Sequence, residues 1–206
     1  MRALLLCLPL LTGACRADSE ALAAAARARL PADDDFATRL CHTALDQTRH
    51  QVRYGGAYVR IAYPGGDVPA DTGVCTDVVI RGLRVLGFDL QQLVHEDMRR
   101  NFAAYPKQWG LKQPDTNIDH RRVPNLQTFF RRRGAALPVS DPPARYQPGD
   151  LITCTVAGRL PHIAIVVPAP DGGPVPWIVH NIGQGPRLEN RLFEFPLTGH
   201  YRWRGE

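Results

Sequence analysis

The stretch 72-TGVCTDVVIRGLR-84 places Cys75 at the first turn of an amphipathic helix. Apolar residues recur with helical spacing from Val78 to Leu86, and Gly87 is expected to end the helix. A thiol at a helix N-terminus is stabilised as a thiolate by the helix dipole, whereas a structural cysteine more often lies inside an element. The rest of the sequence has to decide between these two interpretations.

Helices are also expected before and after this stretch. The patterns predict them at 19–30, 33–52, 89–102 and 123–133, with a short extended piece at 57–63 and irregular chain at 103–125. Asp71 or Thr72 is the expected N-cap of the helix that begins near Cys75.

The pattern changes from helical to extended after a proline-rich connector at 134–150. Short β-rich pieces follow, separated by Gly/Pro turns, at 151–157, 162–167, 175–182, 187–195 and 200–203. The sequence therefore predicts an α+β domain, in which N-terminal helices pack on a C-terminal antiparallel sheet of about five strands.

Residues 1–17 have the pattern of a secretory signal peptide. Arg2 precedes the apolar run 3-ALLLCLPLLTGA-14, which is too short to span a bilayer. Cleavage is expected near 14–17, with a lipoprotein signal at Cys15 as an alternative. We therefore expect an exported, periplasmic protein, whose only membrane attachment would be a lipid anchor.

The mature chain then consists of a helical extension at 18–34 and one domain at 35–206. About 190 residues suit a single core. The formal net charge of +5 is carried almost wholly by arginine, because lysine occurs only at Lys107 and Lys112. This mild basicity argues against nucleic acid as a partner and fits an anionic neighbourhood such as the cell wall or phospholipid headgroups.

Cys41, Cys75 and Cys154 remain in the mature chain, and no paired CxxC suggests a zinc site. A disulfide between Cys41 and Cys154 is one option, and it would leave Cys75 free. Cys75, His162 and His180 are residue types that bind zinc, but no HExxH or close ligand pair accompanies them, so we predict neither a metal nor another cofactor.

Two histidines in the strand region are candidates to activate the thiol. His162 begins the apolar strand HIAIVV, and His180 lies near the end of the next strand, in 178-IVHNIGQG-185. A hairpin turning near 169–174 would place His180 or Asn181 opposite His162. A thiolate needs an imidazole neighbour, and the imidazole needs a polar group to orient it.

This order of residues resembles the NlpC-type cysteine peptidases, a papain-like family of bacterial cell-wall hydrolases. The resemblance matches Cys75 to the helix-heading cysteine, His162 to the strand-initial histidine, and His180, with Asn181 as the alternative, to the third member. The phrase 148-PGDL-151 also resembles a strand of that family. One departure is Val74-Cys75-Thr76-Asp77, where the acid follows the cysteine and implies a different substrate pocket.

A closer resemblance is to a bacterial exported family catalogued as domain of unknown function 1287 (YijF-like). It is carried by AYPGGDVPADTGVCTDVVIRGLR, NIDHRRVPNL, QPGDLITC and the tail from HNIGQG to TGHYRW, and it covers roughly 35–203. That family is thought to belong to the papain-like peptidase group, so the resemblance implies a papain-like catalytic domain.

Five further residues are candidates for substrate binding, each with a structural alternative. Asp77 either caps its own helix or contacts a substrate amine. Asp119, His120 and Arg121 either stabilise a loop or form a cleft wall where arginine binds a peptide carboxylate, and Tyr63 would line the same cleft.

From these features we predict a monomeric periplasmic cysteine hydrolase, an amidase or endopeptidase that acts on peptidoglycan peptides. Two alternatives stay open: a non-catalytic papain-like module that binds wall peptides or a protein partner, and an acyl or peptidyl transferase that uses the same cleft.

Overall fold

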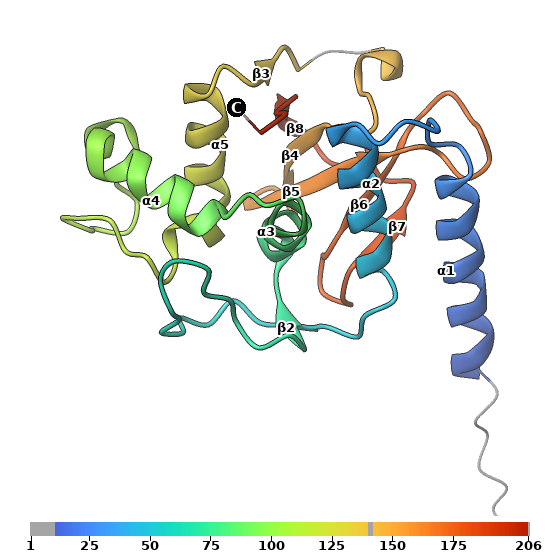
Figure 1. Cartoon of the computed structure of the whole chain (residues 1–206), viewed down its shortest axis with the longest axis horizontal. Coiled ribbons are helices and arrows are strands. Elements are labelled where there is room, and N and C mark those ends of the chain that lie inside the picture. The colour runs from blue at the N-terminus through green and yellow to red at the C-terminus, as the bar shows by residue number, and fades with distance from the viewer. Residues whose placement is uncertain (1–10, 140–141, 206) are drawn as a thin grey trace, which may run out of the picture.

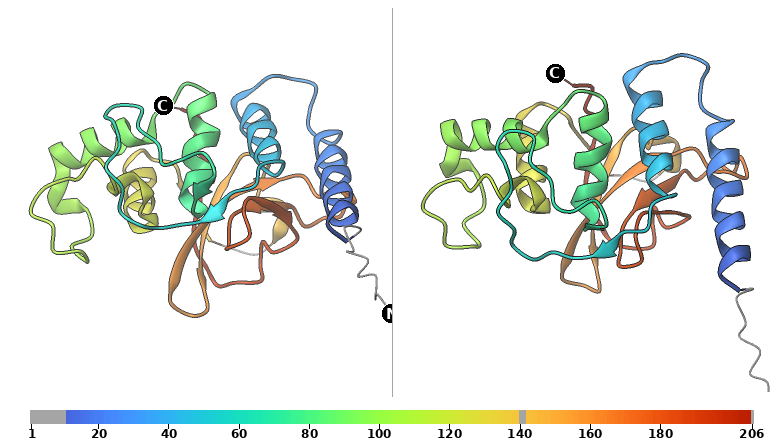
Figure 2. Two further views of the ribbon diagram at one scale, coloured as in Figure 1. Left: turned by 90° about the horizontal axis from the view of Figure 1, so that it is seen from below. Right: turned by 60° about the horizontal axis from the view of Figure 1, so that its bottom comes forward.

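The computed structural model describes residues 11–139 and 142–205, in which the helices lie along one face of an antiparallel sheet (Figures 1 and 2). The helices are α1 (Leu11–Arg27), α2 (Phe36–Gln47), α3 (Cys75–Val85), α4 (Leu90–Asn101) and α5 (Val123–Arg132). Short 3₁₀ turns occupy Phe102–Ala104, Asp119–Arg121 and Pro143–Arg145.

The main sheet contains six strands in the order β3-β8-β4-β5-β6-β7. Their bounds are β3 (Ala136–Leu137), β4 (Leu151–Val156), β5 (Leu160–Val167), β6 (Trp177–His180), β7 (Arg187–Glu189) and β8 (Leu197–Tyr201). The five predicted strands and the α+β class are therefore confirmed. The sixth strand, β3, comes from the segment predicted to be only a connector.

The predicted extended piece at 57–63 is wrong. A two-residue strand β1 (Arg53–Tyr54) pairs in parallel with β2 (Thr72–Gly73) instead. Side chains from other segments bind part of the backbone of 57–63: Asn117 accepts from the Ile61 amide at 3.0 Å, and Gln91 donates to the Ala62 carbonyl at 2.8 Å. The segment is held by these side chains and not by a neighbouring strand.

Helix α1 reaches back into the predicted cleavage region, because it begins at Leu11. Residues 1–10 of the predicted signal peptide lie outside the described residues, so the signal peptide stays a prediction. Among the described residues, no helix is both long and apolar enough to cross a membrane.

Both faces of the central strands are buried, which explains the nearly continuous apolar run in β5. Ile163 and Ile165 pack in a large core with the helices, while Ala164 and Val166 pack on the other face with residues that include Tyr146. Figure 1 shows α3 in front of β5, with α2 and α5 on either side. This packing brings the first turn of α3 against the sheet.

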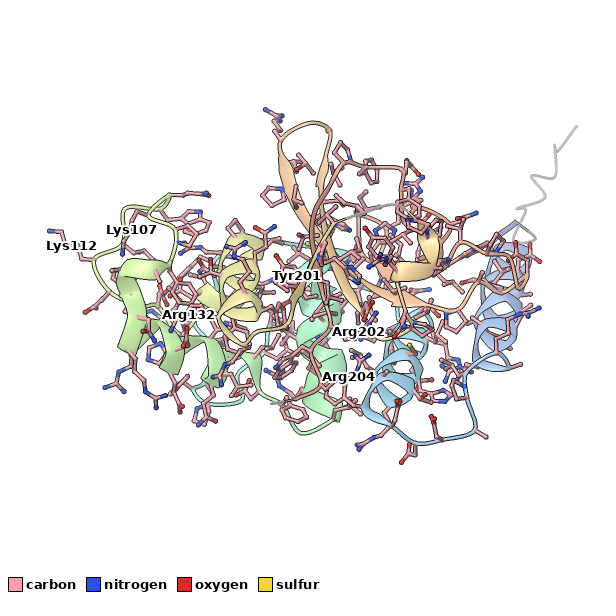
Figure 3. The ribbon with its side chains drawn as sticks, turned by 90° about the horizontal axis from the view of Figure 1, so that it is seen from above. Lys107, Lys112, Arg132, Tyr201, Arg202 and Arg204 are labelled. Atoms are coloured by element: carbon pink, nitrogen blue, oxygen red, sulfur yellow. The ribbon has the colours of Figure 1, made fainter. Side chains whose placement is uncertain are left out.

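Asp150 ties the start of β4 to the end of the chain. Its buried carboxylate accepts hydrogen bonds from His200 Nε2 at 2.7 Å and from Arg202, which follows β8 and is labelled in Figure 3, at 2.8 and 2.9 Å. Burial acts to raise the pKa of Asp150, but these donors hold it below its ordinary value. The strand β4, which the PGDL phrase predicts, thus begins directly after a buried carboxylate that is paired with the end of the chain.

Cys41, Cys75 and Cys154 are all buried free cysteines. The disulfide considered between Cys41 and Cys154 is therefore not formed. Cys41 lies on α2, where its thiol donates to the Val166 carbonyl at 3.5 Å.

Candidate active site

Helix α3 begins at Cys75, as the sequence predicts, but its cap differs from the prediction. The N-cap residue is Val74, and the Asp77 carboxylate accepts a hydrogen bond from the Val74 amide at 2.6 Å. Thr72 is part of β2, which pairs with β1, so the chain is still extended where a cap was expected. An acid in the first turn also suits the helix dipole.

Asp77 and Arg121 form a buried ion pair beneath this helix end. Arg121 Nε and Nη2 donate to the two Asp77 oxygens at 2.9 and 2.8 Å, and both side chains are only 2% exposed. Arg121 Nη2 also donates to the Gly55 carbonyl at 3.2 Å. These contacts favour the capping interpretation of Asp77 and leave neither side chain facing a substrate.

Asp119 and His120 are likewise buried. Asp119 accepts from the Asp115 amide at 2.6 Å and from Arg122 at 3.0 Å, which fixes the loop before α5. Burial lowers the pKa of His120 to about 4, so this imidazole is neutral at physiological pH. The contacts of Asp119 and the burial of both side chains favour the structural interpretation that the sequence left as an alternative.

Tyr63 contacts α4 instead of the cysteine. Its ring packs edge-on against His95, with the ring centroids 5.0 Å apart. None of the contacts described for Tyr63 involves Cys75, His162 or His180. The structure therefore does not bring Tyr63 into the candidate triad.

His162 and His180 are joined directly. His162 Nε2 lies 2.8 Å from His180 Nδ1, and the His180 Nε2 atom lies 2.7 Å from Glu189 Oε2. All three side chains sit on neighbouring strands, β5, β6 and β7. The result is a hydrogen-bonded chain that crosses three strands of the sheet.

The strand register makes these contacts diagonal. Ile165 pairs with Val179, and His180 pairs with Arg187. Continued by three residues, the β5–β6 register sets His162 opposite residue 182, so the predicted direct opposition to 180 or 181 is wrong. Diagonal neighbours still share a face and lie within reach of long side chains.

Glu189 was missed by the sequence analysis, although a signal for it exists. Residues 187 and 189 share a face because side chains alternate along a strand. With Arg187 opposite His180, Glu189 is the next residue on the histidine's face. The hydrogen bond from His180 lowers the pKa of Glu189, so the carboxylate is ionised and can only accept.

When His180 is neutral, the Glu189 carboxylate determines which ring nitrogen of each histidine carries the proton. His180 must donate from Nε2 to Glu189, which leaves its Nδ1 as an acceptor for His162 Nε2–H. His162 Nδ1 then carries a lone pair. The network thus selects the tautomer of His162 that can accept a proton at Nδ1.

Asn181 has a different role. Its side-chain amide donates to the Gly73 carbonyl at 3.3 Å, and its oxygen accepts from the Gly183 amide at 3.1 Å. It thereby ties the end of β6 to the segment just before Cys75. Of the two candidates for the third member, His180 is the one that contacts His162.

Cys75 is buried and its thiol is neutral. Burial raises the pKa of Cys75 to about 12, although the backbone amides of Ile163 and Thr76 act in the opposite direction. Burial, and then the neighbouring His180, lower the pKa of His162 to about 3. Both directions are opposite to those of a thiolate–imidazolium pair, because desolvation outweighs the helix terminus.

The cysteine and the histidine chain meet at β5. The amide of Ile163, the residue after His162, is close enough to the sulfur to lower its pKa. In the described part of the chain no hydrogen bond joins the Cys75 sulfur to His162. The thiol at the head of α3 thus lies beside the backbone of Ile163, the residue that follows His162 on β5.

Tyr54 is a second residue that sequence reasoning missed. It lies exposed on β1, next to the loop that Arg121 holds. Partial desolvation, and then the charges of Cys75 and Asp77, raise the pKa of Tyr54 to about 12. A protonated phenol is therefore within electrostatic reach of the thiol. The only sequence signal was its position shortly before the cysteine loop.

Comparisons with known proteins place these residues within one family. The family described as Domain of unknown function (DUF1287) matches residues 41–203. The protein described as "Uncharacterized protein YijF" from Escherichia coli (strain K12) is 51% identical over 162 residues, which cover 78% of each chain. No solved structure matches the chain.

We expect Asp77→Ala to destabilise the fold by about 3–5 kcal/mol, because it leaves the Arg121 charge buried without a partner. Urea unfolding followed by circular dichroism measures this loss. Asp46→Ala is the matched control, since Asp46 is 53% exposed in a surface ion pair with Arg27 and should cost about 1 kcal/mol or less. A loss of similar size in both variants would contradict the buried ion pair.

Stability should fall on mild acidification. The folded-state pKa values of His162 and His120, about 3 and about 4, lie below the ordinary value of 6.5. Below pH 6.5 the two histidines bind protons in the unfolded chain but not in the native chain. Their contribution to the free energy of unfolding is therefore fully present above pH 6.5 and is lost as the pH falls towards the folded-state pKa values. Each group adds about 1.4 kcal/mol per pH unit to the slope.

Urea unfolding between about pH 7.5 and 5 tests this expectation. His162→Gln and His120→Gln should each flatten the dependence of the free energy of unfolding on pH. A wild-type free energy that is independent of pH in this range would show that neither imidazole is held neutral.

Proposed function

The chain belongs to the DUF1287 family, and from the residues around Cys75 we propose that it is a cysteine hydrolase that cleaves amide bonds in peptidoglycan peptides. Cys75 is the nucleophile, His162 the proton carrier, His180 the residue that orients His162, and Glu189 the carboxylate that orients His180. The related activity of an amide transferase uses the same groups, with an amine in place of water.

One observation carries the proposal: the hydrogen-bonded chain from Glu189 through His180 to His162 ends one residue from the amide beside the Cys75 sulfur. Two imidazoles and a carboxylate in series fix a tautomer and stabilise the imidazolium that forms when a proton arrives.

The neutral thiol sets the first step of the proposed mechanism. A substrate carbonyl enters beside Cys75, and His162 Nδ1 accepts the thiol proton as sulfur attacks the carbonyl carbon. The positive charge on His162 is shared with His180 and balanced by Glu189. His162 then donates the proton to the leaving amine as the amide C–N bond breaks. Water, deprotonated by His162, attacks the thioester, and the released Cys75 thiolate takes the proton back from His162.

The oxyanion of the tetrahedral intermediate needs hydrogen-bond donors. The Cys75 amide is one candidate because it lies at the start of α3, where helix amides are unpaired. Tyr54 is the candidate for the second donor, since its hydroxyl is protonated and close enough for the charge of Cys75 to raise its pKa. Removing one such donor typically costs about 10²–10³-fold in rate.

The resemblance to NlpC-type peptidases supports the assignment of roles and the wall-peptide substrate. It rests on Cys75 at a helix head, His162 at a strand start and His180 on the next strand. The N-terminal signal pattern supports action in the periplasm, where peptidoglycan is within reach. The papain-like relation is therefore part of the proposal, together with a monomeric state.

A second candidate is a non-catalytic module that binds wall peptides or a partner protein. The observation in its favour is the state of Cys75, which is 5% exposed, neutral and without a hydrogen bond to His162 among the described residues. Side-chain alternation on β5 also separates His162 from Ile163, the residue beside the sulfur. This candidate predicts binding without turnover.

Cys75→Ala should abolish release of amine from purified peptidoglycan fragments, because no other group replaces the nucleophile. Cys41→Ala is the control, since Cys41 is also a buried free cysteine but packs on Val166 from α2. Circular dichroism would establish that both variants fold. Turnover retained by Cys75→Ala would refute the hydrolase.

Glu189→Ala should lower kcat by about 10²–10⁴-fold with little change in KM, because His162 loses its preferred tautomer and its charge balance. The pH profile of kcat should shift at the same time, which a purely structural loss would not cause. Glu194→Ala serves as the control on the exposed segment after β7. Equal activity of the two variants would remove Glu189 from the mechanism.

A further inference from the structure

A groove of about 580 Å³ borders the candidate site. Its walls come from α1, the loop after α2, β1 and the loop between β6 and β7, and they include Arg49, Arg53, Asp71 and Arg187. None of these residues has a role in the proposed chemistry.

The groove shares structure with both halves of the site. Arg187 is the register partner of His180, so the two side chains emerge on the same face of the sheet. Arg53 is paired with Thr72 in the β1–β2 ladder, three residues before Cys75. A ligand in the groove therefore lies beside β7, which pairs with the strand of His180, and beside β1, whose partner β2 precedes Cys75.

The charge of the groove is positive and concentrated at one residue. Three arginines face it against the single carboxylate Asp71, which is already paired with Arg53 at 3.0 Å. Arg49 has a distant partner, Asp46, at 3.7 Å. Arg187 is exposed and has no ion-pair partner among the described residues. Its charge helps to lower the pKa of Glu189, two residues along β7, but the two side chains form no ion pair, so the guanidinium is available for an external anion.

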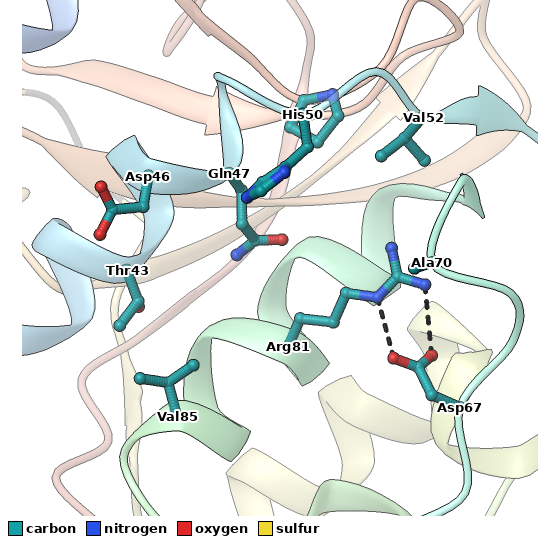
Figure 4. Close-up of a pocket in the computed structure, with 10 residues that line it drawn as sticks. Thr43, Asp46, Gln47, His50, Val52, Asp67, Ala70, Arg81 and Val85 are labelled. Carbon is teal, nitrogen blue, oxygen red and sulfur yellow. Dashed lines mark hydrogen bonds and ion pairs between the residues drawn. The ribbon is translucent and has the colours of Figure 1, made fainter.

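The groove continues into a second cavity of about 370 Å³, shown in Figure 4, because both are lined by His50, Val52 and Pro186. There Arg81 is paired with Asp67 at 2.9 Å, so its charge is neutralised. The trough is therefore longer than one side chain, and the two carboxylates beyond the arginine end, Asp46 and Asp67, are each paired with an arginine. This shape suits an extended peptide better than a small inorganic ion.

We propose that this trough binds an extended peptide through a carboxylate that Arg187 engages with its guanidinium fork. Two parallel N–H···O bonds to a planar carboxylate make arginine specific for this group. The inference rests on the proposed function for one consequence: with its carboxylate on Arg187, the peptide presents a neighbouring amide to Cys75. Arg187 is then the residue that selects acidic peptides.

Equilibrium binding to the Cys75→Ala variant tests the proposal without turnover. The probes are two fluorescein-labelled, C-terminally amidated peptides, Ala-Glu-Ala-Glu-Ala and Ala-Gln-Ala-Gln-Ala, followed by fluorescence anisotropy. The glutamate peptide should bind more tightly, and added Arg187→Gln should weaken it about tenfold without affecting the glutamine peptide. Arg187→Lys should recover only part of the loss, and Arg159→Gln, at the exposed turn between β4 and β5, should have no effect.

Equal binding of the two peptides, binding that Arg187→Gln does not change, or no binding of either peptide would overturn the proposal. These outcomes are separable from those of the hydrolase. If Cys75→Ala abolishes turnover but Arg187→Gln does not change peptide binding, only the proposal for the trough is refuted. If binding of the acidic peptide depends on Arg187 but Cys75→Ala retains turnover, only the assignment of Cys75 as the nucleophile is refuted.

Discussion

The carboxylate of Asp77 is the constraint on which the rest of the site depends. One oxygen accepts from the Val74 amide and thereby fixes where α3 begins, and the pair of oxygens holds Arg121. Arg121 in turn holds the Gly55 carbonyl, next to Tyr54. One buried ion pair thus positions the start of α3, the glycine-rich loop and the strand β1 that precedes this loop. Its loss would release Cys75 from its place against β5.

Desolvation decides the electrostatics of the resting site. A helix terminus stabilises a thiolate by at most about 2 kcal/mol, whereas full burial shifts a pKa by up to about 3–5 units. Burial is the largest influence on the pKa of both Cys75 and His162, so both side chains are neutral. The proposed chemistry therefore depends on the bound substrate and on the Glu189 chain to make proton transfer favourable, instead of on a preformed ion pair.

The sequence predicts the architecture well because its signals are local. Helical spacing after Cys75 and the apolar run after His162 specify α3 and β5, and the 18-residue separation of the two histidines suffices to bring them together. What it could not supply depends on tertiary register. Glu189 becomes a partner of His180 only once Arg187 is known to oppose it, and Asp77 becomes structural only once Arg121 arrives from 44 residues away. Substrate-binding and buried ionic residues look alike in sequence because both are polar.

The most direct measurement is the rate of iodoacetamide alkylation of each cysteine at neutral pH, resolved by peptide mass spectrometry, in the wild type and in His162→Ala. Cys41, Cys75 and Cys154 are all buried free thiols with raised pKa values, so they control for one another. If Cys75 is a nucleophile served by His162, it reacts faster than the other two, and the advantage disappears in His162→Ala. Alkylation of Cys75 no faster than that of Cys41 and Cys154, or unchanged by the substitution, would contradict the account and favour a binding module.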